Sequence, residues 1–206
     1  MLLYHVRFIL SLADVQLDIN SYIQQKLGES QRLQKHFERE GIEPLYYFQE
    51  HARGTFLWVV IVIQQLEKVK SASIFKKYIN GFADASGDME LLYSRVLMRF
   101  TEEDGRWVRE ILSWLVIKQG SMAVDVLKDA VEQALDDELS DFANFLDIDC
   151  GSILNVKKFN PSKISWTPTE DTAVELIHET LRSYLTKDNI AILSFISTRR
   201  KPTVGL

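Results

Sequence analysis

Apolar residues recur at helical spacing over the first part of the chain. The apolar positions of segment 19–27 fall on one helix face, and Asp18 precedes them as a candidate N-cap. A second, charged segment ends near Gly41, and Pro44 suits the first turn of the helix that follows it. The pattern therefore predicts a series of short helices here.

Two further segments, "SASIFKKYINGF" and "GDMELLYSRVLMRF", show the same spacing. Asp88 is a plausible N-cap of the second one. The stretch 82–88 lies between them and is rich in residues that favour turns, so it is the best candidate for a loop between subdomains.

An unbroken apolar run covers residues 56–63 and ends at Gln64 and Gln65. It is too short to cross a membrane, which takes about 20 apolar residues. Its valines and isoleucines also suit a buried strand. The helix-forming continuation "QQLEKVK" favours a helix instead, and such an apolar helix would be buried on all sides.

After residue 101 the pattern predicts three helices, "DGRWVREILSWLVIKQG", "SMAVDVLKDAVEQAL" and "DELSDFANFLDID". Gly120 would end the first and Ser121 would cap the second. Two β-like segments, "GSILNVKKF" and "TAVELIH", follow, and "ETLRSYLTK" closes with a short helix. The first helix would bury a stripe formed by Trp107, Ile111, Trp114 and Leu115, and the second a stripe formed by Val124, Leu127, Val131 and Leu135. Three helices and a hairpin are the order of a winged helix, so the predicted fold class is mainly α with a small β-hairpin.

Composition is that of a globular protein, with 206 residues, 46% apolar residues and 26% charged ones. A single cysteine excludes an internal disulfide framework, and the amino-terminal segment does not follow the pattern of a signal peptide. We therefore expect a soluble, cytoplasmic protein with no membrane association.

Acidic residues concentrate at 121–150, where nine carboxylates meet only Lys128. Nucleic-acid affinity comes mainly from lysine and arginine on phosphates. The predicted second helix of the winged helix, which would enter the major groove, is acidic, so we expect no nucleic-acid partner.

Motifs for catalysis are missing from the sequence. None of the nine glycines precedes a lysine, so there is no phosphate-binding Gly-Lys-Ser/Thr loop. The four histidines lack metal-ligand spacing. Cys150 follows Asp149, whose charge would raise a thiol pKa, so a structural cysteine is favoured over a nucleophile. We expect no enzymatic activity, no catalytic residues and no metal site.

His178 and the segment around Gly54 have structural interpretations from the residues alone. His178 lies between a predicted strand and a predicted helix, where a histidine is more often buried or capping than bound to a ligand. Gly54 would supply a turn, and the large side chains after it would supply burial.

Five segments in this order resemble the region after the ATPase core in fungal NACHT-type signalling ATPases of the STAND class. They are "ARGTFLWVVIVIQQL", "MELLYSRVLMRF", "VREILSWLVIKQGSMAVDVLKDAV", "DCGSILNV" and "VELIHETLRSYL". The resemblance covers roughly residues 18–187. It implies a helical domain at 18–100 and a winged-helix domain at 101–187, with 1–17 a remnant of the segment leaving the core and 188–206 a tail.

The resemblance also implies a nucleotide contact. "GTFL" is similar to the Gly-Leu-Pro-Leu motif of plant immune receptors, which lies against adenine, so Gly54 and Phe56 become candidate cofactor-binding residues. "Ile177-His178-Glu179" is similar to the Met-His-Asp motif, whose histidine reaches the β-phosphate. His178 would then place a positively polarised imidazole near a diphosphate.

The P-loop, the Mg²⁺-binding acid and the parallel sheet of the family have no counterpart in this sequence. We expect no cofactor on the chain's own account, and ADP or ATP only when it joins a P-loop core. The leading hypothesis is a truncated, non-catalytic regulatory module that contacts an ATPase core and neighbouring subunits. Alternatives are a free-standing protein-interaction adaptor and a DNA-binding winged helix.

Overall fold

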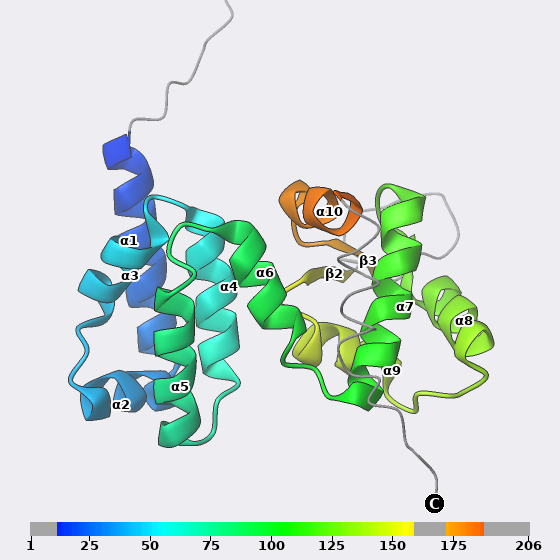
Figure 1. Cartoon of the computed structure of the whole chain (residues 1–206), viewed down its shortest axis with the longest axis horizontal. Helices are drawn as coiled ribbons and strands as arrows, with labels where there is room; N and C mark the ends of the chain where they lie inside the picture. Colours follow the sequence, from blue (N-terminus) through cyan, green and yellow to red (C-terminus); the bar gives the residue numbers. More distant parts are fainter. Residues whose placement is uncertain (1–11, 159–171, 188–206) are drawn as a thin grey trace, which may run out of the picture. The chain divides into compact units, whose positions relative to one another are not determined.

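The computed structural model describes residues 12–158 and 172–187 (Figure 1). The chain forms two compact units that divide after Asp88, at the end of the predicted loop 82–88. The fold is mainly α-helical with a small antiparallel sheet, which confirms the predicted fold class. The boundary predicted from sequence after residue 100 falls inside the second unit. Most of the predicted remnant 1–17, the segment 159–171 and the tail 188–206 lie outside the described residues.

Helices make up the described part of the first unit: α1 (Leu12–Glu29), α2 (Gln31–Glu40), α3 (Pro44–Ala52), α4 (Phe56–Glu67) and α5 (Ala72–Ala83). Gly41 ends α2 in the left-handed conformation at φ 66°, and Pro44 is the first residue of α3, as predicted. The predicted cap at Asp18 is wrong, because α1 begins at Leu12 and Asp18 lies inside it.

The apolar run 56–63 is helical, and α4 lies at the centre of the first unit. It contacts α1, α2, α3 and α5, so almost its whole circumference is buried. Trp58 and Ile61 are both 0% exposed. Burial on every side removes the need for a polar face, which is why the helix tolerates so many β-branched residues.

The turn after α5 is held against α3 and α4 by hydrogen bonds to the backbone. The Trp58 indole Nε1 donates to the carbonyl of Ala85 (3.0 Å). The carbonyl of His51 accepts from the Gly87 amide (3.0 Å) and the Ser86 hydroxyl (2.9 Å). Gly87 has φ +68°, a conformation that favours glycine. The turn is therefore part of the packed first unit.

The second unit contains the described sheet. Its elements are α6 (Met89–Leu97), α7 (Glu102–Lys118), β1 (Met122–Ala123), α8 (Val124–Leu135), α9 (Phe142–Asn144), the π-helical turn η1 (Phe145–Asp149), β2 (Leu154–Lys158), β3 (Thr172–Leu176) and α10 (Glu179–Thr186). The strands are antiparallel in the order β1–β3–β2. The predicted hairpin β2–β3 is confirmed. Helix α6 belongs to this unit because it packs against α10.

Strand β1 was not predicted. Ser121 was expected to cap the helix, but α8 begins only at Val124, with Ala123 at the N-cap position. Residues Met122 and Ala123 instead pair with Val174 and Ala173 of β3. Two residues carry too little pattern to reveal a strand, so its pairing partner determines it.

Helix α7 buries a slightly different face from the one predicted. Trp107, Ile111 and Leu115 are buried, whereas Trp114 is 36% exposed. Val108 and Leu112 are buried as well, which moves the middle of the buried face around the helix. At roughly 100° per residue, Trp114 then lies about 90° from that middle, at the edge of the stripe.

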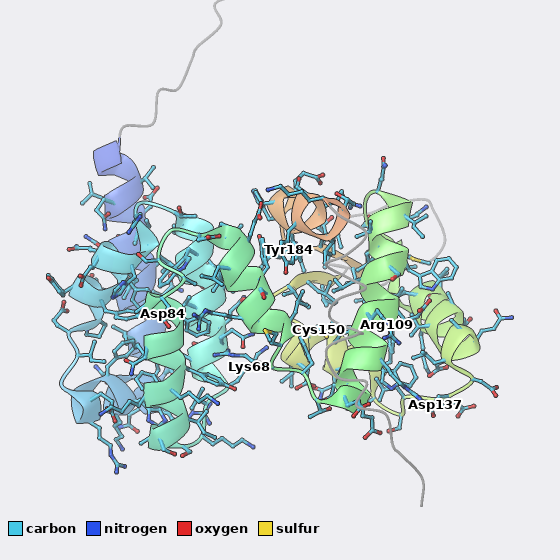
Figure 2. The ribbon with its side chains drawn as sticks, in the orientation of Figure 1. Lys68, Asp84, Arg109, Asp137, Cys150 and Tyr184 are labelled. Carbon is cyan, nitrogen blue, oxygen red and sulfur yellow. The ribbon has the colours of Figure 1, made fainter. Side chains whose placement is uncertain are left out.

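Cys150 and Gly151 join η1 to β2 in a tight connection (Figure 2). The carbonyl of Cys150 accepts from the amides of Ile153 (2.8 Å) and Leu154 (2.9 Å), and the side chain is 0% exposed, consistent with a structural cysteine. A Cβ atom at Gly151 would stand 2.4 Å from the carbonyl oxygen of Asp147. Only glycine fits there without movement of the backbone.

We predict that Gly151→Ala lowers the free energy of unfolding by about 1–3 kcal/mol, as overpacking against rigid atoms does. Urea denaturation followed by circular dichroism would measure it. The matched control is Gly28→Ala in α1, where a Cβ meets nothing within 4 Å. That change should be neutral or stabilise by up to about 1 kcal/mol, because alanine is the better helix former. Equal stability of the two variants would contradict the tight connection.

Candidate functional site

His178 lies between β3 and α10 and caps the helix that follows it. Its side chain is exposed, and its Nδ1 accepts a hydrogen bond from the Thr180 amide (3.1 Å). This bond satisfies one of the amides that every helix leaves open at its first turn. Glu179 follows in the first turn, where the helix dipole favours a carboxylate. The structural interpretation of His178 as a capping residue is confirmed.

A second set of contacts ties α10 to α6. The Tyr93 hydroxyl lies 2.8 Å from the Thr180 hydroxyl, which lies 3.0 Å from the His178 Nδ1. Tyr93 is 0% exposed. Its ring lies 5.8 Å from the ring of Tyr184, a residue of α10 that is labelled in Figure 2. Burial raises the pKa of both tyrosines above the usual value, so both stay protonated. Lys187 and Glu90 add an ion pair between the same segments.

Arg182 connects α10 to the end of α7. Its Nη1 donates to the carbonyls of Leu115 (3.0 Å) and Val116 (2.6 Å), two of the last four carbonyls of α7, which have no partner within the helix. Its Nε lies 3.1 Å from the Glu179 carboxylate. The side chain is only 15% exposed, so these bonds form largely out of water.

A cleft of about 450 Å³ opens beside His178. Its lining is Gln119, Gly120, Glu175, Leu176, His178, Glu179 and Arg182. This lining has two carboxylates and one guanidinium: Arg182 pairs with Glu179, and Glu175 pairs with Lys157, which is not part of the lining, at 2.7 Å. The cleft therefore offers a diphosphate little net positive charge of its own.

Gly54 and Phe56 lie together at the start of α4 in the first unit. Arg53 and Gly54 both have positive φ, 48° and 77°, and turn the chain from α3 into α4. Phe56 is 39% exposed, and its ring lies 5.2 Å from the ring of Tyr22 on α1. Thr55 occupies the N-cap position without a side-chain cap bond. The ring of Phe56 is thus accessible at a helix start, as contact with a base would require. His178, the other part of the predicted nucleotide contact, belongs to the second unit.

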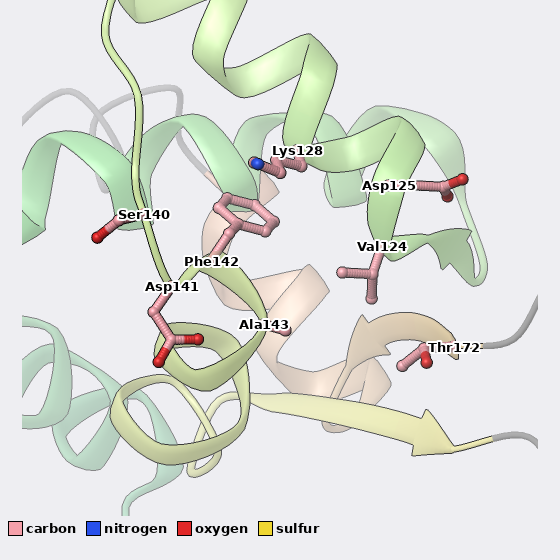
Figure 3. A pocket seen from close by; sticks show the side chains of 8 residues that line it. All are labelled: Val124, Asp125, Lys128, Ser140, Asp141, Phe142, Ala143 and Thr172. Atoms are coloured by element: carbon pink, nitrogen blue, oxygen red, sulfur yellow. The ribbon is translucent and has the colours of Figure 1, made fainter.

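A second pocket, of about 460 Å³, lies at the amino-terminal ends of α8 and α9 (Figure 3). Val124 and Phe142 form its apolar part, and Asp125, Asp141 and Lys128 are its charged side chains. Lys128 lies 3.7 Å from Glu132, so its charge is partly compensated. The surroundings of the pocket are acidic.

Within residues 12–158 and 172–187, the structure groups no three histidine, cysteine, aspartate or glutamate side chains in a way that could hold a metal ion. None of the helices in this described part has the length and apolar character needed to span a bilayer.

Sequence reasoning missed Tyr93, Thr180 and Arg182 as supports of His178. All three lie within the segments "LYSRVL" and "IHETLRSYL" that carried the resemblance. The order of those segments could have suggested a contact between them. The distances between their hydroxyl groups depend on how α6 and α10 pack, which no local pattern encodes.

Comparison with known proteins finds one informative relative. Over 155 residues, 72% of its length, the chain is 28% identical to the vegetative incompatibility protein HET-E-1 of Podospora anserina. The chain spans only 11% of that relative. No family model matches the chain, and no solved structure matches it. The match suggests a fungal signalling protein of the NACHT type, in agreement with the resemblance.

We predict that His178→Ala destabilises the chain by about 1 kcal/mol, because it removes the N-cap of α10. His178→Asn should retain most of that stability, since asparagine is among the best N-cap residues. Amide hydrogen exchange in the first turn of α10 would report the difference. Equal exchange rates in the two variants would show that His178 does not cap the helix in solution.

Proposed function

We propose that this chain is a non-catalytic regulatory module of a NACHT-type signalling ATPase, which acts through contacts with a P-loop core and neighbouring subunits. The observation that carries the proposal is the exposed His178 at the junction of β3 and α10, held in place by its cap bond and by Thr180. An imidazole presented in this way can approach a phosphate held by another domain. The match to HET-E-1 supports the same family.

The order of elements in the second unit supports a winged helix at its carboxyl-terminal side. Helix α7, strand β1, helices α8 and α9, and the hairpin β2–β3 follow one another, with β3 between β1 and β2. This is the arrangement of a helix-turn-helix variant with a small sheet. In the proposed module, α10 follows the sheet and carries the residues that approach the nucleotide.

The nucleotide would be ADP or ATP held chiefly by the core. The lining of the cleft at His178 has no excess of positive charge, and the sequence contains no Gly-Lys-Ser/Thr loop to cradle phosphates. The chain alone therefore supplies neither strong nucleotide binding nor hydrolysis in this proposal. Gly54 and Phe56 would contribute base contacts from the first unit.

We predict that the purified chain binds an ADP-loaded, NACHT-type ATPase core in isothermal titration calorimetry. His178→Asn should weaken this binding about tenfold or more, because a hydrogen bond to a charged group contributes about 1.5–3 kcal/mol. Asparagine keeps the helix cap, so the loss would report the imidazole and not unfolding.

The nucleotide-free core is the matched control, and His178→Asn should leave any binding to it unchanged. If the wild-type chain and His178→Asn bind the ADP-loaded core with equal affinity, His178 does not have the proposed role. If the chain binds the core neither with nor without ADP, the proposal that it is a regulatory module is contradicted.

A free-standing interaction adaptor is the second candidate function, and the acidic pocket at α8 and α9 favours it (Figure 3). Asp125 on α8 and Asp141 before α9 are exposed and line the pocket together with the apolar side chains of Val124 and Phe142. A protein segment that alternates basic and apolar side chains would complement this surface. The same charges disfavour the DNA-binding alternative, because they repel phosphates.

If the adaptor function holds, a short peptide of alternating arginine and leucine should bind the chain in fluorescence anisotropy, and more weakly at high salt. Asp125→Asn combined with Asp141→Asn should reduce the affinity several-fold. Asp18→Asn with Glu50→Gln removes two exposed charges from the first unit and serves as the control. Equal losses in both double variants would indicate attraction to net charge alone and would argue against a docking pocket.

A further inference from the structure

We propose that Tyr93 of α6 is a positioning residue for His178. Through the Thr180 hydroxyl, it supports the ring orientation in which the Thr180 amide selects the tautomer with the proton on Nε2. The site would then offer the Nε2–H group as a hydrogen-bond donor to an oxygen of the ligand. The identity of that ligand as a nucleotide phosphate rests on the proposed function, whereas the arrangement of the ring does not.

The Thr180 amide determines the first part of this arrangement. A backbone N–H can only donate, so the Nδ1 atom at 3.1 Å must present its lone pair. A neutral imidazole has one protonated nitrogen and one lone pair. With Nδ1 as the acceptor, the ring proton of His178 lies on Nε2.

The direction of the hydroxyl bonds follows from the same lone pair. The Thr180 hydroxyl lies between Tyr93 (2.8 Å) and the His178 Nδ1 (3.0 Å). Because Nδ1 accepts, the Thr180 hydroxyl donates to it, and the remaining bond requires Tyr93 to donate to Thr180. Burial raises the pKa of Tyr93, which keeps this donor protonated. The Nδ1 lone pair is then shared by the Thr180 amide and the Thr180 hydroxyl, and the Tyr93 hydroxyl has the Thr180 oxygen as its acceptor.

The hydrogen bonds that run from Tyr93 through the Thr180 hydroxyl to His178, here called the relay, make the orientation of His178 depend on α6. Tyr93 is buried and its ring lies against Tyr184, so its hydroxyl cannot turn to water while α6 and α10 stay packed. A shift of α6 away from α10 would remove the donor to Thr180 and loosen the ring. The packing of α6 would therefore control how well His178 presents its Nε2–H to a phosphate oxygen.

Long-range ¹H–¹⁵N spectra of the histidine rings in the labelled full chain would test the relay without any nucleotide. Wild-type His178 should show the Nε2–H tautomer. Thr180→Val should move the Nδ1 resonance of His178 downfield, because an acceptor nitrogen that loses a hydrogen-bond donor is deshielded. Tyr93→Phe should cause a smaller shift in the same direction. Thr180→Ser keeps the hydroxyl and should restore the wild-type resonance.

Tyr184→Phe is the matched control, because it also removes a phenolic hydroxyl group, one whose hydrogen bond goes to Ser94 and not to Thr180. It should leave the His178 resonances unchanged. The relay is overturned if wild-type His178 carries its proton on Nδ1, or if Tyr93→Phe and Tyr184→Phe give the same spectrum. Titration of the ADP-loaded core with the Tyr93→Phe chain is a separate measurement. If the ring responds but the wild-type chain does not bind the core, the relay stands and the proposed function fails.

Discussion

Two hydrogen bonds from the Arg182 guanidinium to the end of α7 determine where α10 lies, and the site at His178 depends on that position. A helix as short as α10 is marginal in isolation, so its place comes from tertiary contacts. The last carbonyls of α7 need donors, and Arg182 reaches two of them at Leu115 and Val116. Tyr93 adds a second attachment from α6. One short helix thus satisfies groups on two longer helices of its unit.

The two ring nitrogens of His178 have separate functions, because only one of them is needed to satisfy a backbone amide. Its Nδ1 belongs to the fold, because it accepts from the amide of Thr180. Its Nε2 carries the ring proton and remains for a ligand. A cap made by serine or aspartate would stabilise the helix equally well but would leave no second nitrogen. A histidine cap can also donate a hydrogen bond from the far side of its ring.

In the first unit, the buried apolar helix α4 is the element to which other parts of the unit are attached. Helix α4 is surrounded by other helices, and the indole of Trp58 extends from it to the carbonyl of Ala85. The turn that ends the unit is thereby attached to its core. Phe56 begins the same helix but remains partly exposed, so a rigid element presents it to solvent. Sites placed on rigid elements hold their geometry better than sites on loops.

Most helices, the hairpin and the capping position of His178 could be predicted from local sequence patterns. Helical spacing, Gly41, Pro44 and the alternation in 172–176 are local signals, and each acts over a few residues. Local patterns did not reveal the features that depend on tertiary contacts. These are strand β1, the exposure of Trp114 and the contacts of Tyr93, Thr180 and Arg182. Met122 and Ala123 become a strand because β3 lies beside them. Tyr93 and Thr180 are 87 residues apart along the chain, and only the packing of α6 on α10 brings their hydroxyl groups together.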